Sequence, residues 1–220
     1  MGTISNPSFG ELAKEASLQP QEKLQALKKD NNSLSIGIPK ETIFQEHRIP
    51  LSPMAVQLLV QQGHSVKLES NCGEKANFTD IEYCSHGAEI VLDAKEVYKA
   101  DIIIKVAPPT EEEVELMKPN QILISAIQMV RTKEIVIKRM LEKGIVAIGY
   151  EFLRDDENSL PIIRSMSELA GRASVLIAAE YLSNYNSGKG ELFGGLPGIQ
   201  PTQIVILGAG AVAEYAIKAA

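Results

Sequence analysis

The sequence predicts an α/β fold, in which a Rossmann-like or flavodoxin-like, mostly parallel sheet is flanked by helices and followed by the start of a second domain. Two observations predict it. From Ser35 onward, short apolar segments alternate with helical segments, as they do in βα units around a parallel sheet. Near the C-terminus, the β-branched run 204–206 passes directly into a glycine-rich turn and then into helix-forming residues, which is the strand, turn and helix order of a Rossmann unit.

Composition is typical of a globular protein and excludes several classes of partner. The chain has 220 residues, of which 45% are hydrophobic and 23% charged, enough for one large domain or for one domain and the start of another. Its net charge is -6 and its basic residues are scattered, so we expect no nucleic-acid partner. Because no long apolar run or secretory segment is found, we expect a cytoplasmic protein with no membrane partner. Cys72 and Cys84 lack metal-ligand spacing, so both are expected to be small, partly buried thiols, and no metal site is expected.

The first 33 residues differ from the rest of the chain. They are polar and contain two short helical patterns interrupted by Pro20. Leu24 and Leu27 are spaced to share one helix face. We therefore expect a helical arm over residues 1–33, either loose or packed on a neighbouring subunit, followed by a substrate domain over residues 34–160.

Five strands are expected in the substrate domain, at 35–38, 65–69, 101–106, 121–125 and 145–148. The first helix should begin near Pro53, which suits a first helical turn, and should end at Gly63. Val56, Leu59 and Val60 share one face of this helix. Further helices are expected over 80–87, 111–117 and 132–143, with a polar turn at 155–159.

A long helical segment over residues 162–182 carries several small residues, at positions 170, 171, 173 and 178. Small side chains allow close helix packing, so this helix is expected to join two domains. The segment 186–202 has five glycines and two prolines and is expected to be a loop. Residues 161–202 therefore form an interdomain helix and linker, and residues 203–220 begin a second Rossmann domain.

Residues 208–213 have the G-x-G-x-x-G/A pattern of a dinucleotide-binding turn. Gly208 can make a tight turn without a Cβ penalty, and Gly210 leaves room for a pyrophosphate against the backbone. Ala213 allows close packing of the following helix on the strand. The N-terminus of that helix attracts phosphate, so the pattern predicts a dinucleotide cofactor.

Two basic residues are candidate substrate ligands. Arg48 lies in a loop that follows the strand 35–38, and ligands bind beyond the carboxyl ends of strands in open α/β sheets. An arginine there can bind a carboxylate through two parallel hydrogen bonds, although a solvated surface position is the alternative. Lys105 lies within an apolar run. It is either a buried, functional ammonium that needs a partner or an edge residue whose amine reaches water.

Two polar residues complete the candidates. Gln128 follows the carboxyl end of the strand 121–125 and can donate and accept hydrogen bonds but cannot exchange a proton near neutral pH. Ser167 lies near the start of the long helix, where it can bind a phosphate or cap the helix.

The chain resembles the alanine dehydrogenase and pyridine nucleotide transhydrogenase family from about Ser35 to its C-terminus. The resemblance depends on segments that occur in the family's order and spacing: 36–41, 46–53, 104–106, 121–124, 166–172, 194–198 and 208–210. Members that are alanine dehydrogenases convert L-alanine and water to pyruvate and ammonium with NAD. The resemblance therefore implies an NAD-dependent oxidoreductase with a small-molecule substrate and a homo-oligomeric assembly, although NADP is not excluded. The family's nucleotide domain is inserted into its substrate domain.

The resemblance also implies roles for individual residues. Arg48 and Lys105 would bind the substrate carboxylate and carbonyl, with Lys105 catalytic. Ser167 would contact NAD. The residues that would face its pyrophosphate are Gly208, Gly210, Val212 and Ala213.

One departure leaves the catalytic outcome open. Gln128 stands where alanine dehydrogenases place an acid/base histidine, and such a group typically contributes about 10²–10⁴-fold to the rate. His47, beside Arg48, is the other histidine on a candidate site loop, although a surface role is favoured for it. A nucleotide-binding, regulatory relative without dehydrogenase activity and a transhydrogenase nucleotide subunit are therefore the alternatives. A segment of 220 residues is expected to be inactive on its own.

Overall fold

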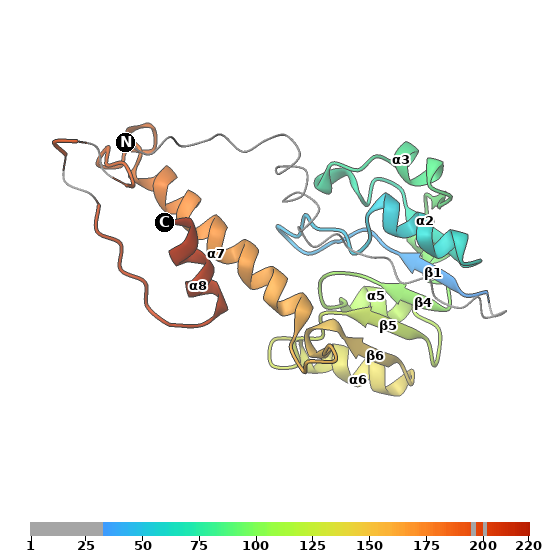
Figure 1. Ribbon diagram of the computed structural model, residues 1–220. Helices are drawn as coiled ribbons and strands as arrows, with labels where there is room; N and C mark the ends of the chain where they lie inside the picture. The colour runs from blue at the N-terminus through green and yellow to red at the C-terminus, as the bar shows by residue number, and fades with distance from the viewer. Residues whose placement is uncertain (1–32, 195–196, 200–201) are drawn as a thin grey trace. The chain divides into compact units, whose positions relative to one another are not determined.

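The structure, a computed structural model, describes residues 33–194, 197–199 and 202–220, so the predicted arm over 1–33 lies almost entirely outside the described residues. A six-stranded sheet forms the centre, in the order β3-β2-β1-β4-β5-β6, and every neighbouring pair is parallel (Figure 1). The strands are β1 (Ser35–Ile38), β2 (Ser65–Glu69), β3 (Glu89–Val91), β4 (Ile102–Ile104), β5 (Ile122–Ser125) and β6 (Val146–Gly149). The α/β fold class is confirmed.

Helices connect the strands and continue beyond the sheet. The connecting helices are α2 (Pro53–Gln61), α3 (Asp80–Ser85), α4 (Ala94–Val97), α5 (Glu111–Leu116) and α6 (Glu134–Glu142). Short 3₁₀ turns lie at Glu74–Ala76, Tyr150–Phe152 and Asn184–Asn186. After β6 come the long helix α7 (Pro161–Leu182) and helix α8 (Ala211–Ala219).

Side-chain caps set the starts of the short helices. Thr79 and Glu82 form a capping box at α3, and Thr110 and Glu113 form one at α5. Each box satisfies backbone N–H groups that the first helical turn leaves without partners. Lys143, which follows α6, donates from Nζ to carbonyl oxygens at the end of α5, at 2.7 to 3.2 Å. This contact fixes α6 against α5.

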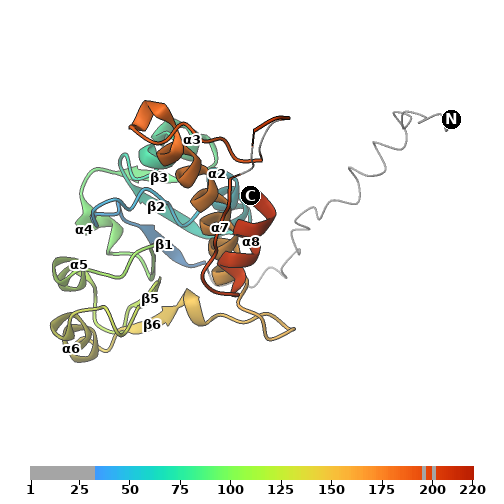
Figure 2. The same cartoon turned by 90° about the vertical axis from the view of Figure 1, so that its left-hand side faces the viewer.

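Each face of the sheet has its own apolar core. On one face, Ile103 and Leu123 pack with residues of α5 and α6 such as Val114 and Met140, and Figure 2 shows α4, α5 and α6 together on this side. On the other face, Ile36, Ile38, Val66 and Leu68 pack with Val56 of α2 and Tyr83 of α3. The inner strands β4 and β5 are covered on both faces and are nearly continuous apolar runs, whereas β2 also carries Lys67 and Glu69.

Most predicted elements are present within one or two residues of their expected bounds, but three differences matter. The prediction missed β3 and the single-turn helix α4. It was also wrong about the fingerprint strand, because residues 203–207 form no strand and Val205 and Leu207 are 83% and 94% exposed. A strand needs a neighbour for its N–H and C=O groups, and none of the six described strands pairs with this run.

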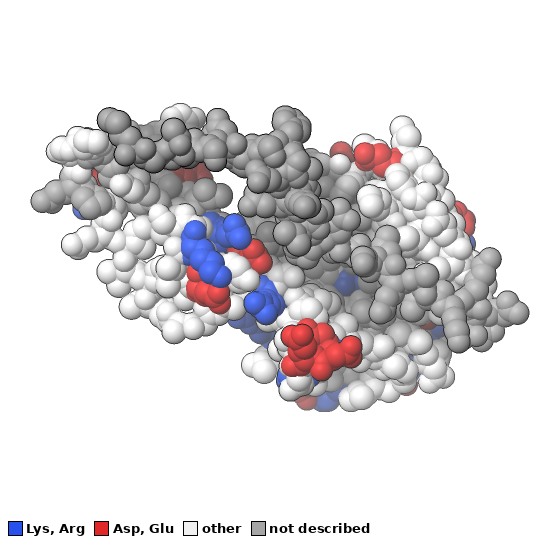
Figure 3. All heavy atoms as spheres, viewed as in Figure 1, with Lys and Arg blue, Asp and Glu red and all other residues white. Residues whose placement is uncertain are grey.

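Helices α7 and α8 pack tightly on each other. A Cβ atom added to Gly171 of α7 would lie 2.4 Å from the carbonyl oxygen of Val212 in α8, so glycine is required at this crossing. Figure 3 shows basic and acidic side chains mixed over these two helices, where Arg172 pairs with Glu168 at 2.9 Å and Lys218 with Glu214 at 2.5 Å. Of the small residues predicted for close helix packing, Gly171 has that role, whereas those at positions 170, 173 and 178 are exposed.

The two cysteines differ in their exposure. Cys72 is half-buried and free, and burial raises the pKa of its thiol to about 12, whereas Cys84 is exposed and not partly buried as expected. Within the described ranges, no helix has both the length and the apolar character needed to cross a membrane.

Candidate active site

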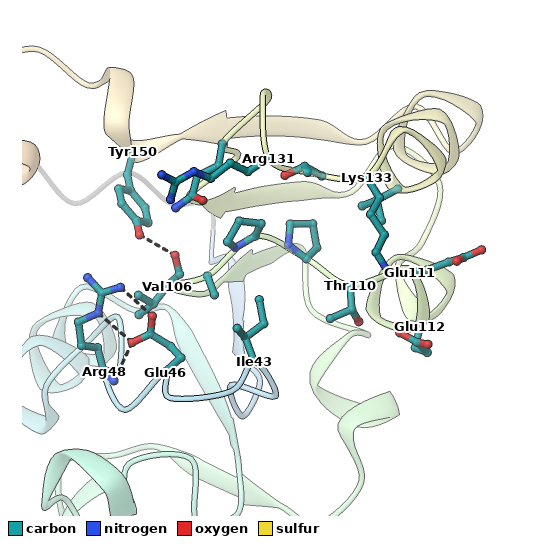
Figure 4. Close-up of a pocket in the computed structure, with 16 residues that line it drawn as sticks. Ile43, Glu46, Arg48, Val106, Thr110, Glu111, Glu112, Arg131, Lys133 and Tyr150 are labelled. Atoms are coloured by element: carbon teal, nitrogen blue, oxygen red, sulfur yellow. Dashed lines mark hydrogen bonds and ion pairs between the residues drawn. The ribbon is translucent and has the colours of Figure 1, made fainter.

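A cavity of about 490 Å³ lies beyond the carboxyl ends of β1, β4 and β5. Its walls come from the loops that follow these strands and from Tyr150, directly after β6 (Figure 4). Arg48, Gln128 and Arg131 are among the polar residues that line it. Parallel strands bring their carboxyl ends to one edge of the sheet, which is where α/β proteins bind ligands. We treat this cavity as the candidate substrate site.

Arg48 is half-exposed, with 53% of its side chain accessible, and is held by Glu46. Its Nε donates to Glu46 Oε1 at 2.8 Å and its Nη2 donates to Oε2 at 2.7 Å. These hydrogen bonds lower the pKa of Glu46 and raise that of Arg48. The pair occupies one edge of the guanidinium. On the other edge, Nη1 donates to Met166 Sδ at 3.2 Å, and a carboxylate can replace this weak acceptor.

Lys105 is fully buried and lies in a cluster with two carboxylates. Its Nζ donates to Glu113 Oε1 and Oε2 at 2.9 and 2.7 Å and lies 3.4 Å from Glu41 Oε2. The structure therefore rules out the edge position with a solvated amine. A buried ammonium needs such partners because an unpaired charge in an apolar interior is strongly destabilised.

Glu41 is the less well-satisfied carboxylate of this cluster. Its Oε1 accepts the backbone N–H groups of Val106 and Ala107, at 2.5 and 3.3 Å, whereas its buried Oε2 has no hydrogen-bond partner. Desolvation raises the pKa of Glu41 despite the nearby charge of Lys105. The oxygen without a partner leaves this carboxylate able to accept one more hydrogen bond.

A second cavity, of about 260 Å³, adjoins the first. Lys105 and Met166 line it, and Arg48, Val106 and Tyr150 are shared by both cavities. The Tyr150 hydroxyl donates to the Val106 carbonyl at 2.5 Å, and burial raises the pKa of Tyr150. Arg48 and Tyr150 therefore stand where the two cavities meet.

Gln128 lines the larger cavity from a strained loop. Its φ is +43°, an uncommon value for a residue with a side chain. Glu151 Oε1 accepts the N–H groups of Ile127 and Gln128, at 2.8 and 2.9 Å. Lys105 lines only the smaller cavity and His47 lines a third, very small one with Glu41. The structure thus brings Arg48 together with Lys105 and with Gln128, but not Lys105 with Gln128.

The glycine-rich turn has a cavity of its own, of about 450 Å³, lined by Ser167, Ala209, Gly210 and Ala211. Gly208 has φ +116°, and a Cβ at Gly208 or Gly210 would have open space. Gly210 caps α8 without a side-chain hydrogen bond, so the first N–H groups of the helix have no side-chain acceptor from its cap. An anion such as pyrophosphate fits this arrangement. Val212 is exposed, whereas Ala213 is buried.

Comparison with known proteins decides the family. The family model "Alanine dehydrogenase/PNT, N-terminal domain" matches residues 37–170, which is more than half of the chain, and the model of the family's C-terminal domain matches residues 174–220. The chain belongs to the alanine dehydrogenase/PNT family. This finding confirms the resemblance to alanine dehydrogenases and pyridine nucleotide transhydrogenases.

Several family members are similar over most of this chain. An alanine dehydrogenase of Methanococcus maripaludis is 41% identical over 84% of the chain and 50% of its own length, and one of Staphylococcus saprophyticus is 39% identical over 84% and 50%. A solved L-alanine dehydrogenase superposes with a TM-score of 0.79 at 38% identity, over 84% of this chain and 51% of that one. A transhydrogenase from Sinorhizobium meliloti has a TM-score of 0.61 at 28% identity, over 67% and 44%. The chain thus spans about half the length of the alanine dehydrogenases that it matches.

The alanine dehydrogenase/PNT sequence pattern pointed to Arg48, Lys105, Gln128 and Ser167, but not to the residues that hold them. Glu46, Glu113 and Tyr150 were missed. Glu46 is two residues from Arg48, and the threonine and glutamate spacing of 110–113 marks a capping box, so signals for two of them were available. Tyr150 gave no local signal, because only the fold brings it beside Val106.

Proposed function

We propose that the full-length protein is an NAD-dependent amino-acid dehydrogenase of the alanine dehydrogenase type. The observation that supports it most is Arg48, which lines both cavities beyond the sheet and whose Nη1 meets only the weak acceptor Met166 Sδ. The family membership and the 36–41% identity to alanine dehydrogenases support the same activity. Because the chain spans half of these relatives, the activity is proposed for the complete protein.

In this proposal, Arg48 binds the substrate carboxylate through its Nη1 side, while Glu46 keeps the guanidinium plane fixed. An arginine prepared in this way loses little side-chain freedom on binding. The Tyr150 ring stands beside the bound carboxylate. The substrate is thereby oriented with its reacting carbon toward the smaller cavity.

Lys105 polarises the substrate carbonyl in this proposal. Two of its three N–H donors are directed at Glu113, and the third faces Glu41 Oε2 over a long 3.4 Å contact. The third donor can therefore turn to a substrate oxygen while the ammonium stays paired with Glu113. Gln128, from the larger cavity, can orient water or the carbonyl oxygen but cannot act as the acid/base.

We propose NAD as the cofactor, with Ser167 and the turn at Gly208 and Gly210 against its phosphates. When bound there, NAD supplies a hydride acceptor for the amino-acid Cα. Val212 and Ala213 contribute backbone N–H groups at the start of α8, although the buried Ala213 side chain itself packs within the protein.

Formation of NADH by the full-length protein with L-alanine and NAD tests the proposal directly. We expect Lys105→Met to abolish turnover, because the polarising charge is lost. The double variant Lys105→Met with Glu113→Gln removes the unpaired carboxylate and controls for unfolding. Turnover in the single variant near the wild-type rate would refute the role of Lys105.

A second candidate, a nucleotide-binding relative without dehydrogenase activity, is favoured by Gln128 alone. The variant Gln128→His separates the two, since histidine tolerates the left-handed φ at this position. A gain of about 10²-fold or more in alanine oxidation favours a dehydrogenase with a weakened acid/base step. No turnover in either form, with NAD binding retained, favours the regulatory role.

A further inference from the structure

A second arginine, Arg131, lines the larger cavity, and the proposed mechanism does not use it. Within the described ranges, no ion pair within 4.0 Å includes Arg131. Lys133, the other basic residue beside it, extends toward Glu111, away from Tyr150 and Arg48 (Figure 4). Arg48 pairs with Glu46. Arg131 is therefore the cavity cation that lies on the Tyr150 side and makes no ion pair in the described part of the chain.

The backbone that carries Arg131 is well fixed. Gln128, at φ +43°, accepts the N–H groups of Arg131 and Thr132 at its carbonyl oxygen, at 2.7 and 3.0 Å. Thr132 Oγ1 donates to the Ile127 carbonyl at 2.6 Å, and Glu151 holds the start of the same loop. A strained turn held by several hydrogen bonds is a common way to place a functional side chain.

The two arginines reach the cavity from different loops. In Figure 4, the Arg131 side chain extends toward Tyr150 from the loop after β5, and Arg48 approaches the Tyr150 hydroxyl from the other side. The cavity volume is about 490 Å³, whereas one water occupies about 30 Å³ of the liquid. Alanine has only six non-hydrogen atoms, so the cavity has room for a longer substrate. Space and charge are therefore both available for a longer, doubly anionic substrate.

We propose that the preferred substrate of this protein carries a second carboxylate, which Arg131 binds while Arg48 binds the first. The substrate class is a dicarboxylic 2-amino acid and the matching dicarboxylic 2-oxo acid. This inference rests on the proposed dehydrogenase function and specifies its substrate. Gln128, at the base of the same turn, can donate its amide N–H to the second carboxylate, where a neutral histidine would present one donor at most.

The reaction has the same stoichiometry as that of alanine dehydrogenases. In the reductive direction, the 2-oxo acid, ammonium, NADH and one proton give the amino acid, NAD and water. The carbonyl oxygen leaves as water, nitrogen takes its place, and the hydride adds to the same carbon. The second carboxylate takes no part in the chemistry and contributes only binding.

Oxidation of NADH by the full-length protein, with ammonium and either pyruvate, oxaloacetate or 2-oxoglutarate, tests the inference. We expect kcat/KM for one of the dicarboxylic acids to exceed that for pyruvate by about tenfold or more, since a charged hydrogen bond contributes about 1.5–3 kcal/mol. Arg131→Gln should reduce this preference ratio by about 10- to 100-fold, and Arg131→Lys by less, because lysine keeps the charge but loses the planar geometry. Arg139→Gln, on helix α6 and outside the residues that line the cavity, is the matched control and should leave the ratio within about twofold.

Calorimetric binding of 2-oxoglutarate, oxaloacetate and pyruvate to the same variants gives a readout that needs no turnover. If pyruvate is preferred by the wild type, or if Arg131→Gln leaves the ratio unchanged, the inference is overturned while the dehydrogenase function stands. If no oxo acid is reduced, the proposed function fails. In that case, the calorimetric affinities decide. If Arg131→Gln weakens the binding of a dicarboxylic acid by about tenfold or more, the second-carboxylate site is supported. If the wild type and Arg131→Gln bind the acid equally, the site is overturned.

Discussion

The candidate site contains two ionic groups, and each shifts the pKa of one of its carboxylates in the opposite direction to the other. The buried cluster of Lys105, Glu113 and Glu41 is nearly closed to solvent, with side chains 0 to 8% exposed, and desolvation raises the pKa of Glu41. The outer pair of Arg48 and Glu46 keeps 53% of the arginine side chain exposed, and its hydrogen bonds lower the pKa of Glu46.

The difference shows which physical effect dominates at each depth. In the cluster, one ammonium is shared by two carboxylates. For Glu41, the loss of hydration raises the pKa by more than the charge of Lys105 lowers it. In the outer pair, the guanidinium serves one carboxylate through two hydrogen bonds and water remains close. We infer that Glu113 and Glu41 fix the Lys105 ammonium in place, and that the outer pair is available for ligand exchange.

The largest expected effect comes from breaking the buried cluster. Glu113→Ala should lower the free energy of unfolding by about 3–5 kcal/mol, because it leaves the Lys105 ammonium without its nearest partner and removes an acceptor for the Thr110 N–H. Urea denaturation measures this change. Glu113→Gln, which keeps an acceptor for the helix cap, should cost less. A loss below about 1 kcal/mol in Glu113→Ala would show that the cluster is not structural.

Breaking the outer pair should affect binding more than stability. Arg48→Met should lower kcat/KM by about 10- to 100-fold while the free energy of unfolding changes by less than about 1 kcal/mol. Steady-state kinetics and urea denaturation on the same preparation separate the two effects. Arg139→Met is the matched control, since Arg139 makes only long contacts of 3.5 Å to Glu115 and Glu142. Equal losses of activity in both variants would contradict a specific role for Arg48.

The smallest expected effect is on the pH dependence of the free energy of unfolding, and it amounts to about 1 kcal/mol or less. The contributions of Glu46 and Glu41 should change with pH in opposite directions. The lowered pKa of Glu46 stabilises the fold above the ordinary value of 4.5, so the advantage of the wild type over Glu46→Gln should shrink as pH falls. The raised pKa of Glu41 stabilises the fold at low pH, so the wild type should lose stability relative to Glu41→Gln as pH rises above that value. Thermal or urea denaturation across pH measures both slopes, and slopes of one sign would remove the contrast.

Much of the fold could be predicted because its signals are local. The strand β1 and the helix α2 were predicted with their bounds within two residues, since a β-branched run and a proline at the first helical turn are strong signals. The strand β3 has only three residues, none of them fully buried, which is too short to show a periodicity. The run 203–207 has the composition of a strand but no strand partner in the described residues. The composition of a segment does not show whether a neighbouring strand is present.

The candidate site was predictable in its residues but not in their partners. The apolar surroundings of Lys105 predicted an unusual lysine, yet the choice between a buried and a solvated amine depended on its partners, Glu113 and the more distant Glu41. Gln128 was noticed for its chemistry, and its left-handed backbone was not. Arg131 was not among the predicted site residues, because only the fold shows that it shares a cavity with Arg48.

Gly171 fixes the distance between helices α7 and α8. At this residue α7 and α8 touch backbone to backbone, so no side-chain rotamer can absorb a small displacement between them. Five residues earlier in α7, Met166 accepts a hydrogen bond from Arg48 Nη1 at 3.2 Å, and the next residue, Ser167, lines the cavity at the start of α8. Adjacent positions of one helix, about 1.5 Å apart along its axis, thus face the two ligand cavities, and their spacing is set by covalent geometry.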